Sequence, residues 1–219
     1  MSCGNGNAPN STARHFVFAL ISAPNNFKLA VIRIFIVLSL TTFLSHAGVY
    51  GDLEFGDSRE TVTRKMSASQ LVEQTIDSTF FGRTGLNGVF KCKAKLAGLS
   101  YHLYFGWNED GGLNEVTLRS SELSMEEYGR GLRRAWGEAE ALFSQVYQKP
   151  SQKADYPDQK AFTKHNILIS HVWHRGENQS ILMGPGIDKG KCFLAIRYVN
   201  QRIVLPSLPK KPSNPKKNR

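Results

Sequence analysis

Apolar and polar residues alternate through the middle of the chain. Residues 89–96 place apolar residues and one cysteine on one face and three lysines on the other, and residues 99–107 repeat the alternation. The Asn-Glu-Asp-Gly-Gly stretch at 108–112 is typical of a hairpin turn, and residues 113–120 form the expected returning strand. Strict alternation predicts strands that are half-buried in an antiparallel sheet.

A helical period replaces the alternation in residues 124–147, where apolar residues recur every three or four positions. This spacing predicts one long helix with a continuous apolar face. Ser124 and Glu127 have the spacing of a capping box at its start. Three glycines interrupt the helix, and a close approach of helix to sheet is one reason to keep them: Gly129, Gly131 and Gly137.

A shorter helix is predicted after Asp57 or Ser58, because Val62 and Met66 stand four residues apart behind a capping residue. Further strands are predicted at 49–55, 167–174, 180–184 and 191–199. The elements predict an α+β domain over residues 48–204. Its antiparallel sheet has about six strands with two helices on one face, in an order compatible with two helix-then-strand halves.

The N-terminal 47 residues have the layout of a secretion signal. Eleven uncharged residues, 34–44, follow Lys28 and Arg33, and the small-residue site Ser45-His46-Ala47 comes next. This pattern predicts export to the periplasm or the exterior, with cleavage after Ala47; the unusually long polar start suggests that translation begins downstream. The alternative is an inner-membrane anchor formed by uncleaved residues 29–47.

The formal charge of +10 is concentrated at the two ends of the chain. Residues 48–209 hold 20 basic and 18 acidic residues, so the folded body is nearly neutral and nucleic acid is not an expected partner. Residues 205–219 predict a disordered tail with proline at every third position. Its basic residues would contact an anionic surface outside the cytoplasm: Lys210, Lys211, Lys216, Lys217 and Arg219.

Two cysteines remain after removal of the leader, Cys92 and Cys192, both on the apolar faces of predicted strands. In an oxidising compartment they can form a disulfide, and the alternative is two buried free thiols. Residues 184–192 resemble a phosphate-binding loop only loosely, because Pro185 and Cys192 break that pattern; a hairpin is expected there.

No catalytic residue, metal ligand set or cofactor is expected from the sequence. His171 and His174 are three apart on a predicted strand and therefore point to opposite faces. His102 and Tyr104 lie on the less apolar side of their strand, which makes them the first candidates for a binding face.

The stretch Phe-Gly-Asp-Ser-Arg-Glu-Thr-Val at 55–62 carries a short resemblance through Phe55, Gly56, Ser58 and Val62. It resembles the F-G-x-S-x-x-x-V opening of small bacterial envelope domains. These include SmpA-type outer-membrane-assembly lipoproteins and β-lactamase-inhibitor-protein-like folds. The chain departs from the lipoproteins because no cysteine directly follows the apolar segment, and more widely it is similar to uncharacterised secreted bacterial α+β proteins.

The resulting expectation is a secreted or periplasmic, non-catalytic module that binds another, unknown macromolecule. The alternative is an envelope hydrolase whose ionisable groups converge only in the folded chain. An exposed aromatic or apolar sheet face would favour the first function, and converging ionisable groups in a deep cleft would favour the second.

Overall fold

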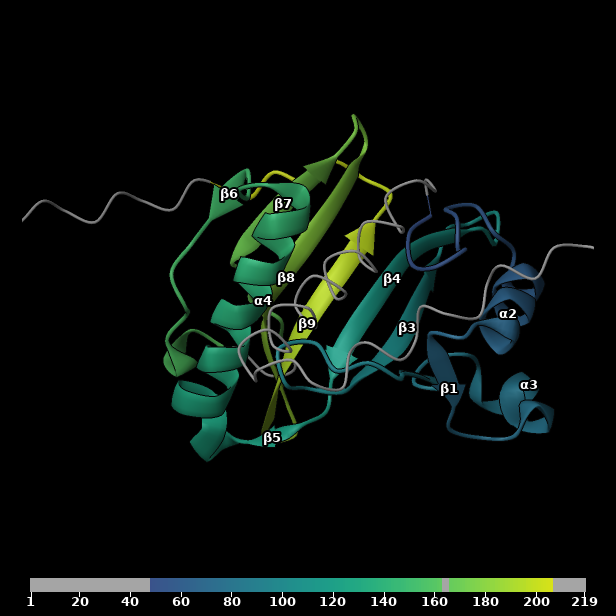
Figure 1. Ribbon diagram of the computed structural model, residues 1–219, viewed down its shortest axis with the longest axis horizontal. Coiled ribbons are helices and arrows are strands. Elements are labelled where there is room, and N and C mark those ends of the chain that lie inside the picture. Colours follow the sequence, from purple (N-terminus) through teal and green to yellow (C-terminus); the bar gives the residue numbers. More distant parts are fainter. Residues whose placement is uncertain (1–47, 163–165, 207–219) are drawn as a thin grey trace, which may run out of the picture. The chain divides into compact units, whose positions relative to one another are not determined.

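The computed structural model describes residues 48–162 and 166–206 (Figure 1). Within these ranges the chain forms one antiparallel sheet of nine strands. The strands are β1 (Val72–Gln74), β2 (Phe90–Cys92), β3 (Tyr101–Trp107), β4 (Leu113–Ser120), β5 (Leu123–Ser124), β6 (Gln152–Lys153), β7 (His171–Arg175), β8 (Gln179–Asp188) and β9 (Lys191–Val199). The α+β class is confirmed. The predicted count of about six strands is too low, because β1, β5 and β6 are only two or three residues long and show no alternation.

Helices precede and separate the groups of strands along the chain. They are α2 (Arg59–Ala68), α3 (Phe81–Thr84) and α4 (Arg133–Tyr147); a 3₁₀ turn (Met125–Glu127) and a π turn (Tyr128–Leu132) lead directly into α4. Shorter 3₁₀ turns occupy Ser78–Phe80 and Gln159–Ala161. The sheet order is β1-β2-β3-β4-β9-β8-β7-β6, with β5 paired to β9. Each half of the sheet therefore follows a helix, and the last strands of the two halves, β4 and β9, pair at its centre.

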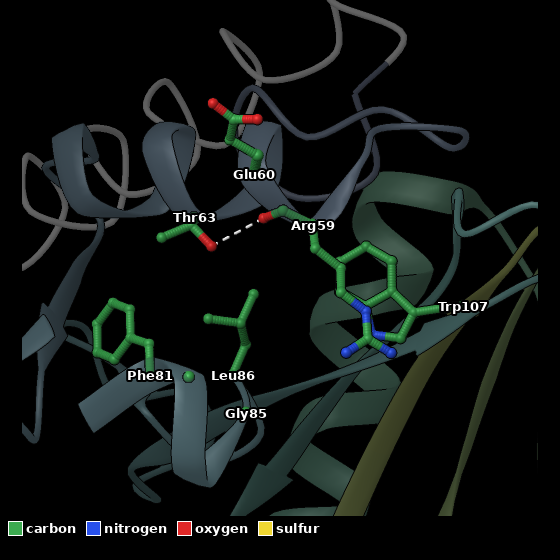
Figure 2. Close-up of a pocket in the computed structure, with 8 residues that line it drawn as sticks. Arg59, Glu60, Thr63, Phe81, Gly85, Leu86 and Trp107 are labelled. Carbon is green, nitrogen blue, oxygen red and sulfur yellow. Dashed lines mark hydrogen bonds between the residues drawn. The ribbon is translucent and has the colours of Figure 1, made fainter. Parts of the chain in front are cut away.

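The helices pack on one face of the sheet. Val62 and Met66 of α2 and Ala139 and Phe143 of α4 are buried in the same hydrophobic cluster as the strands. Figure 1 shows α4 lying across β7, β8 and β9, with α2 and α3 beside the β1–β3 end. Between α2 and α3 the surface is hollowed (Figure 2).

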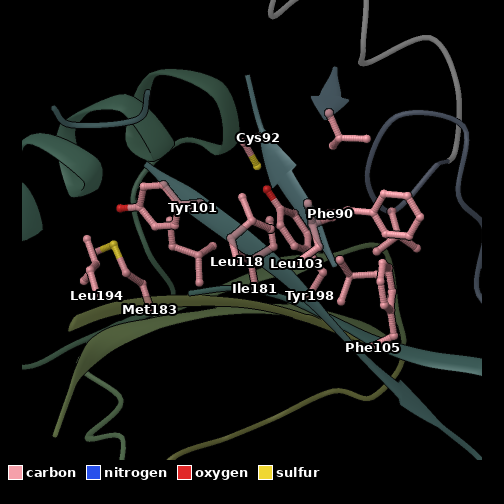
Figure 3. Packing of buried hydrophobic residues seen from close by; sticks show 14 of the residues in the cluster. Phe90, Cys92, Tyr101, Leu103, Phe105, Leu118, Ile181, Met183, Leu194 and Tyr198 are labelled. Carbon is pink, nitrogen blue, oxygen red and sulfur yellow. The ribbon is translucent and has the colours of Figure 1, made fainter. Parts of the chain in front are cut away.

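The core is built by cross-strand rows of apolar side chains, because residues paired directly across a ladder point to the same face. One row runs from β3 to β8 through Leu103, Leu118, Ile196 and Met183, and it ends on β7 at the buried, polar His171. Figure 3 shows these rows filled by aliphatic and aromatic side chains from β2, β3, β4, β8 and β9. The row is continuous across the sheet, so the helix-facing side is a single core.

The structure confirms a capping residue predicted for α2 but not the capping box predicted for the long helix. Ser58 caps α2 by accepting a hydrogen bond from the Thr61 amide at 3.2 Å. Ser124 precedes the long helix but makes no side-chain capping bond, so the predicted capping box is wrong. The expected reason for the helix glycines is also wrong: a Cβ on Gly129 or Gly137 would meet nothing within 4 Å.

The structure confirms some of the predicted strands and not others. The ranges 113–120 and 191–199 are strands as predicted, and 184–192 is part of the β8–β9 hairpin rather than a phosphate loop. Residues 49–55 are not a strand: Tyr50 and Leu53 form one isolated bridge around Gly51, whose φ of +56° turns the chain.

Gln148 ends α4 in a strained conformation, with φ of 66° and ψ of −163°. This region is populated almost only by glycine and costs a side-chain-bearing residue about 1–3 kcal/mol. Gln148→Gly is therefore expected to raise the free energy of unfolding by about 1 kcal/mol, after the larger chain entropy of glycine is subtracted. Urea denaturation measures the change. Lys149→Gly, next to it at an ordinary φ, is the control and is expected to destabilise; stabilisation by both variants would contradict the strain.

Candidate functional site

The face of the sheet opposite the helices has two regions. Over β7, β8 and β9 it is apolar: Val172, Leu182 and Val199 form a second buried cluster, against which Ile203 and Leu205 pack. The C-terminal segment is held there because Leu205 donates its amide to Gln152 Oε1 at 2.7 Å and accepts from Gln152 Nε2 at 3.0 Å. This part of the face is covered by the chain itself.

The same face is polar over β2, β3, β4 and the neighbouring part of β9. We call this region the polar sheet face; it consists of Lys91, His102, Tyr104, Glu115, Thr117, Arg119 and Arg197. All seven residues are half-buried. They line up in rows across the ladders, such as Tyr104, Thr117 and Arg197, so their side chains project together from a rigid backbone.

Ion pairs order the cations of the polar sheet face. Arg197 donates two hydrogen bonds to the Glu115 carboxylate, from Nε at 2.8 Å and from Nη2 at 2.6 Å. Burial opposes ionisation of Glu115, but the hydrogen bonds from Arg197 and Thr117 outweigh it and lower the pKa of that carboxyl. The bidentate geometry fixes both side chains on the central β4–β9 pair.

The other two cations are paired nearer the edges of this region. Lys91 contacts Glu73 at 2.7 Å on the β1 side. Arg119 contacts Glu122 at 2.9 Å and Asp188 at 3.1 Å, and its guanidinium lies 3.9 Å from the ring centroid of Phe193. Because each cation already has a carboxylate partner, this face offers little net positive charge to a polyanion.

The two residues singled out from the sequence, His102 and Tyr104, both lie on the polar sheet face, as their alternation predicts. Burial and the neighbouring Lys91 ammonium lower the pKa of His102, so the imidazole is neutral at pH 7. The Tyr104 ring lies against Gly88, where an added Cβ would be 3.5 Å from the phenol oxygen. The face therefore presents a neutral imidazole and a phenol between charge-compensated pairs.

A Ser–His–Glu arrangement lies elsewhere, under the helices, and sequence reasoning missed it. Ser170 Oγ is 3.0 Å from His171 Nδ1, and His171 Nε2 is 3.3 Å from Glu140 Oε2 without good hydrogen-bond alignment. Ser170 is only 2% exposed and His171 is 0% exposed. No substrate can reach a hydroxyl in that position, so the geometry of a triad serves here as a buried polar network.

The network joins one hydroxyl to three partners. Ser170 Oγ accepts the Trp136 indole N–H at 2.7 Å and lies 3.1 Å from the Met183 carbonyl oxygen and 3.0 Å from His171 Nδ1. Its single proton bonds either the carbonyl oxygen or Nδ1, and the tautomer of the imidazole differs between these two arrangements. Burial lowers the pKa of His171; Glu140 raises it and Lys153 lowers it, and the net shift is downward.

Acid is expected to destabilise the fold through His171. Because the folded pKa lies below the unfolded value of about 6.5, the unfolded chain binds the proton first as pH falls. The free energy of unfolding should be at its full value above about pH 6.5 and should decline below it. Urea denaturation between about pH 5 and 7 tests this; His171→Gln should flatten the decline more than His102→Gln, and equal slopes in all three proteins would contradict it.

Cys92 and Cys192 are both free and buried, so the structure shows the second of the two arrangements expected from the sequence. They lie on β2 and β9, which β3 and β4 separate in the sheet. Three strand spacings amount to about 14 Å, well beyond the roughly 7 Å that a disulfide can bridge. Burial raises the pKa of both thiols, which makes them unreactive.

Three further expectations concern the two histidines of β7, metal or membrane sites, and the two ends of the chain. His171 and His174 face opposite sides of β7: the first contacts Glu140 in the core and the second lies 3.4 Å from Ser180. Among the described residues, no group of histidine, cysteine and carboxylate side chains could hold a metal ion, and no helix is long and apolar enough to cross a membrane. The leader 1–47 and the tail cations, Lys210, Lys211, Lys216, Lys217 and Arg219, lie outside the described residues.

The four residues that resemble envelope domains have local structural roles at the entry to α2. Gly56 has a φ of +92° and donates its amide to the Leu113 carbonyl at 2.8 Å, Ser58 caps the helix, and Val62 is buried. Phe55 packs against the main cluster. No known protein-family model, no curated protein and no solved structure matches this chain.

Proposed function

We propose that this chain is a non-catalytic binding module that takes a protein partner on the polar sheet face. The observation that carries the proposal is the asymmetry of the sheet. One face is buried by helices, while the other presents an imidazole, a phenol and three ordered cation–carboxylate groups on β2, β3, β4 and β9. A side-chain array fixed by a sheet loses little conformational entropy when it binds.

Charge compensation supports a protein partner over nucleic acid. Lys91, Arg119 and Arg197 each contact at least one carboxylate, so a phosphate backbone would compete with pairs that already exist. Tyrosine and arginine, in contrast, are the side chains that most often dominate protein–protein binding energy. The polar sheet face carries both types close to its centre.

The competing function, an envelope hydrolase, has one structural observation in its favour: the Ser170–His171–Glu140 network. Its two central members are 2% and 0% exposed, and Ser170 Oγ already has partners in Trp136 and His171. A nucleophile must reach its substrate, so we propose a structural role for this network.

Affinity capture tests the proposed function. The exported protein and the double variant His102→Ala, Tyr104→Ala serve as baits in an extract of the source cells, with Gln145→Ala on the exposed side of α4 as the matched control. We expect the double variant to lose its specific protein partner by about tenfold or more and the control to keep it. Equal recovery by all three baits would exclude the polar sheet face as the binding surface.

Export remains part of this proposal. The supporting pattern is the charged, apolar and small-residue order of residues 28–47, with the basic tail proposed as a contact to an anionic surface. Cleavage after Ala47 should leave Gly48 as the first residue, and intact-mass measurement of the exported protein checks this. A mass that still includes residues 34–47 would support the membrane anchor instead.

A further inference from the structure

The hollow between α2 and α3 is separate from the polar sheet face. Its volume is about 310 Å³, at the lower end for small-molecule sites. The walls come from α2, α3 with the following loop, and the end of β3: Arg59, Glu60, Thr63, Phe81, Gly82, Gly85, Leu86 and Trp107. None of these residues belongs to the polar sheet face. Phe81, Leu86 and Trp107 make its interior apolar (Figure 2).

Arg59 places a positive charge at this hollow. Its guanidinium carbon lies 5.1 Å from the ring centroid of Trp107, which orients it by a cation–π contact. Within residues 48–162 and 166–206 no carboxylate lies within ion-pair distance of Arg59, whereas Lys65 on the same helix is paired with Asp57 at 2.9 Å. An oriented guanidinium with unused donors suits a carboxylate or similar anion.

Trp107 adds a second hydrogen-bond donor at the hollow. The other two tryptophans place their indole N–H groups on protein acceptors: Trp136 on Ser170 Oγ at 2.7 Å and Trp173 on the Gln148 carbonyl at 3.1 Å. In the described part of the chain the Trp107 indole N–H has no acceptor. Two donors without a protein acceptor among the described residues therefore stand beside an apolar interior.

The acidic residue at the rim does not cancel this charge. Figure 2 shows the Glu60 carboxylate directed away from Phe81 and Leu86. Thr63 already donates its hydroxyl to the Arg59 carbonyl at 2.8 Å. Arg59 and Trp107 are therefore the polar groups that can recognise a ligand in the hollow.

We propose that the hollow between α2 and α3 binds a small organic anion with an aromatic group. Its carboxylate is held by the Arg59 guanidinium and the Trp107 indole N–H. Its ring packs against Phe81 and Leu86, in the space that the missing side chains of Gly82 and Gly85 leave open; a Cβ built on either glycine meets nothing within 4 Å.

Three probes of the same shape and different charge test the proposal: phenylpropionate, phenylpropanol and phenylpropylamine. The Trp107 indole N–H signal, assigned with Trp107→Phe, reports binding in NMR titrations. We expect a saturable shift with phenylpropionate and at least about tenfold weaker binding of the alcohol and the amine. No saturable shift, or equal affinity for acid and alcohol, would overturn the proposal.

Variants distinguish the contribution of the Arg59 charge to binding from the contribution of the space in the hollow. Arg59→Gln should reduce the affinity for phenylpropionate to that for the alcohol, and Arg64→Gln, an exposed arginine on α2 outside the hollow, should leave it unchanged. Gly82→Leu should fill the space and remove binding of all three probes, with the dispersed spectrum confirming that the fold is kept. Unchanged affinity in Arg59→Gln, or an equal loss in Arg64→Gln, would show that Arg59 does not recognise the anion.

Discussion

Gly184→Ala is expected to destabilise the protein by about 3 kcal/mol or more. Gly184 belongs to β8. A side chain at this position would point to the sheet face opposite the helices, where the segment 167–169 lies next to it. A Cβ at this position would lie 1.9 Å from the Leu168 carbonyl oxygen and 3.0 Å from Ile169 Cα. These are backbone atoms, so a side-chain rotation cannot relieve the overlap.

Urea denaturation of the soluble fraction measures this loss, and Gly137→Ala is the matched control. Gly137 lies inside α4, where an added Cβ meets nothing within 4 Å. Alanine has the higher helix propensity, so this variant should gain about 1 kcal/mol. A stability of Gly184→Ala within about 1 kcal/mol of the starting protein would contradict the close approach of segment 167–169 to β8.

Ser170→Ala is expected to lower the free energy of unfolding by about 2–4 kcal/mol while leaving partner binding unchanged below the melting temperature. The substitution removes the acceptor of the Trp136 indole N–H and the hydroxyl that lies within hydrogen-bond distance of His171 Nδ1 and the Met183 carbonyl oxygen. Each buried polar group left without a partner costs about 1–3 kcal/mol. Thermal denaturation and capture of the partner are measured on the same preparation.

The control for Ser170→Ala is Ser144→Ala. Ser144 is half-buried on α4, and its hydroxyl makes no hydrogen bond within the described part of the chain. Its replacement should change the stability by no more than about 0.5 kcal/mol. Loss of partner binding in folded Ser170→Ala, with stability unchanged, would contradict the structural role of the network and favour the hydrolase.

The sequence predicts best those elements that are long enough to leave a local pattern. Residues 113–120 and 191–199 are runs of eight and nine residues without glycine or proline, and they are strands over those ranges. The strands β1, β5 and β6 contain two or three residues, and they exist because a neighbouring strand pairs with them. Pairing between distant segments leaves no local pattern to read.

The candidate sites follow the same rule. His102 and Tyr104 could be assigned to one sheet face because they are two residues apart on an alternating strand. Their neighbours Arg119 and Arg197 come from β4 and β9, and only the ladder register brings them there. The Ser170–Glu140 network and the Arg59–Trp107 contact join residues 30 and 48 positions apart, and the residue types alone do not indicate either pair.

Site-specific photo-crosslinking tests the central claim, binding through the polar sheet face, most directly. Benzoylphenylalanine replaces Tyr104 in one protein and Gln145, on exposed α4, in the other, and both are irradiated in an extract of the source cells. We predict one discrete crosslinked protein from position 104 that is absent from position 145. The same crosslinked species from both positions, or from position 145 alone, would contradict the claim.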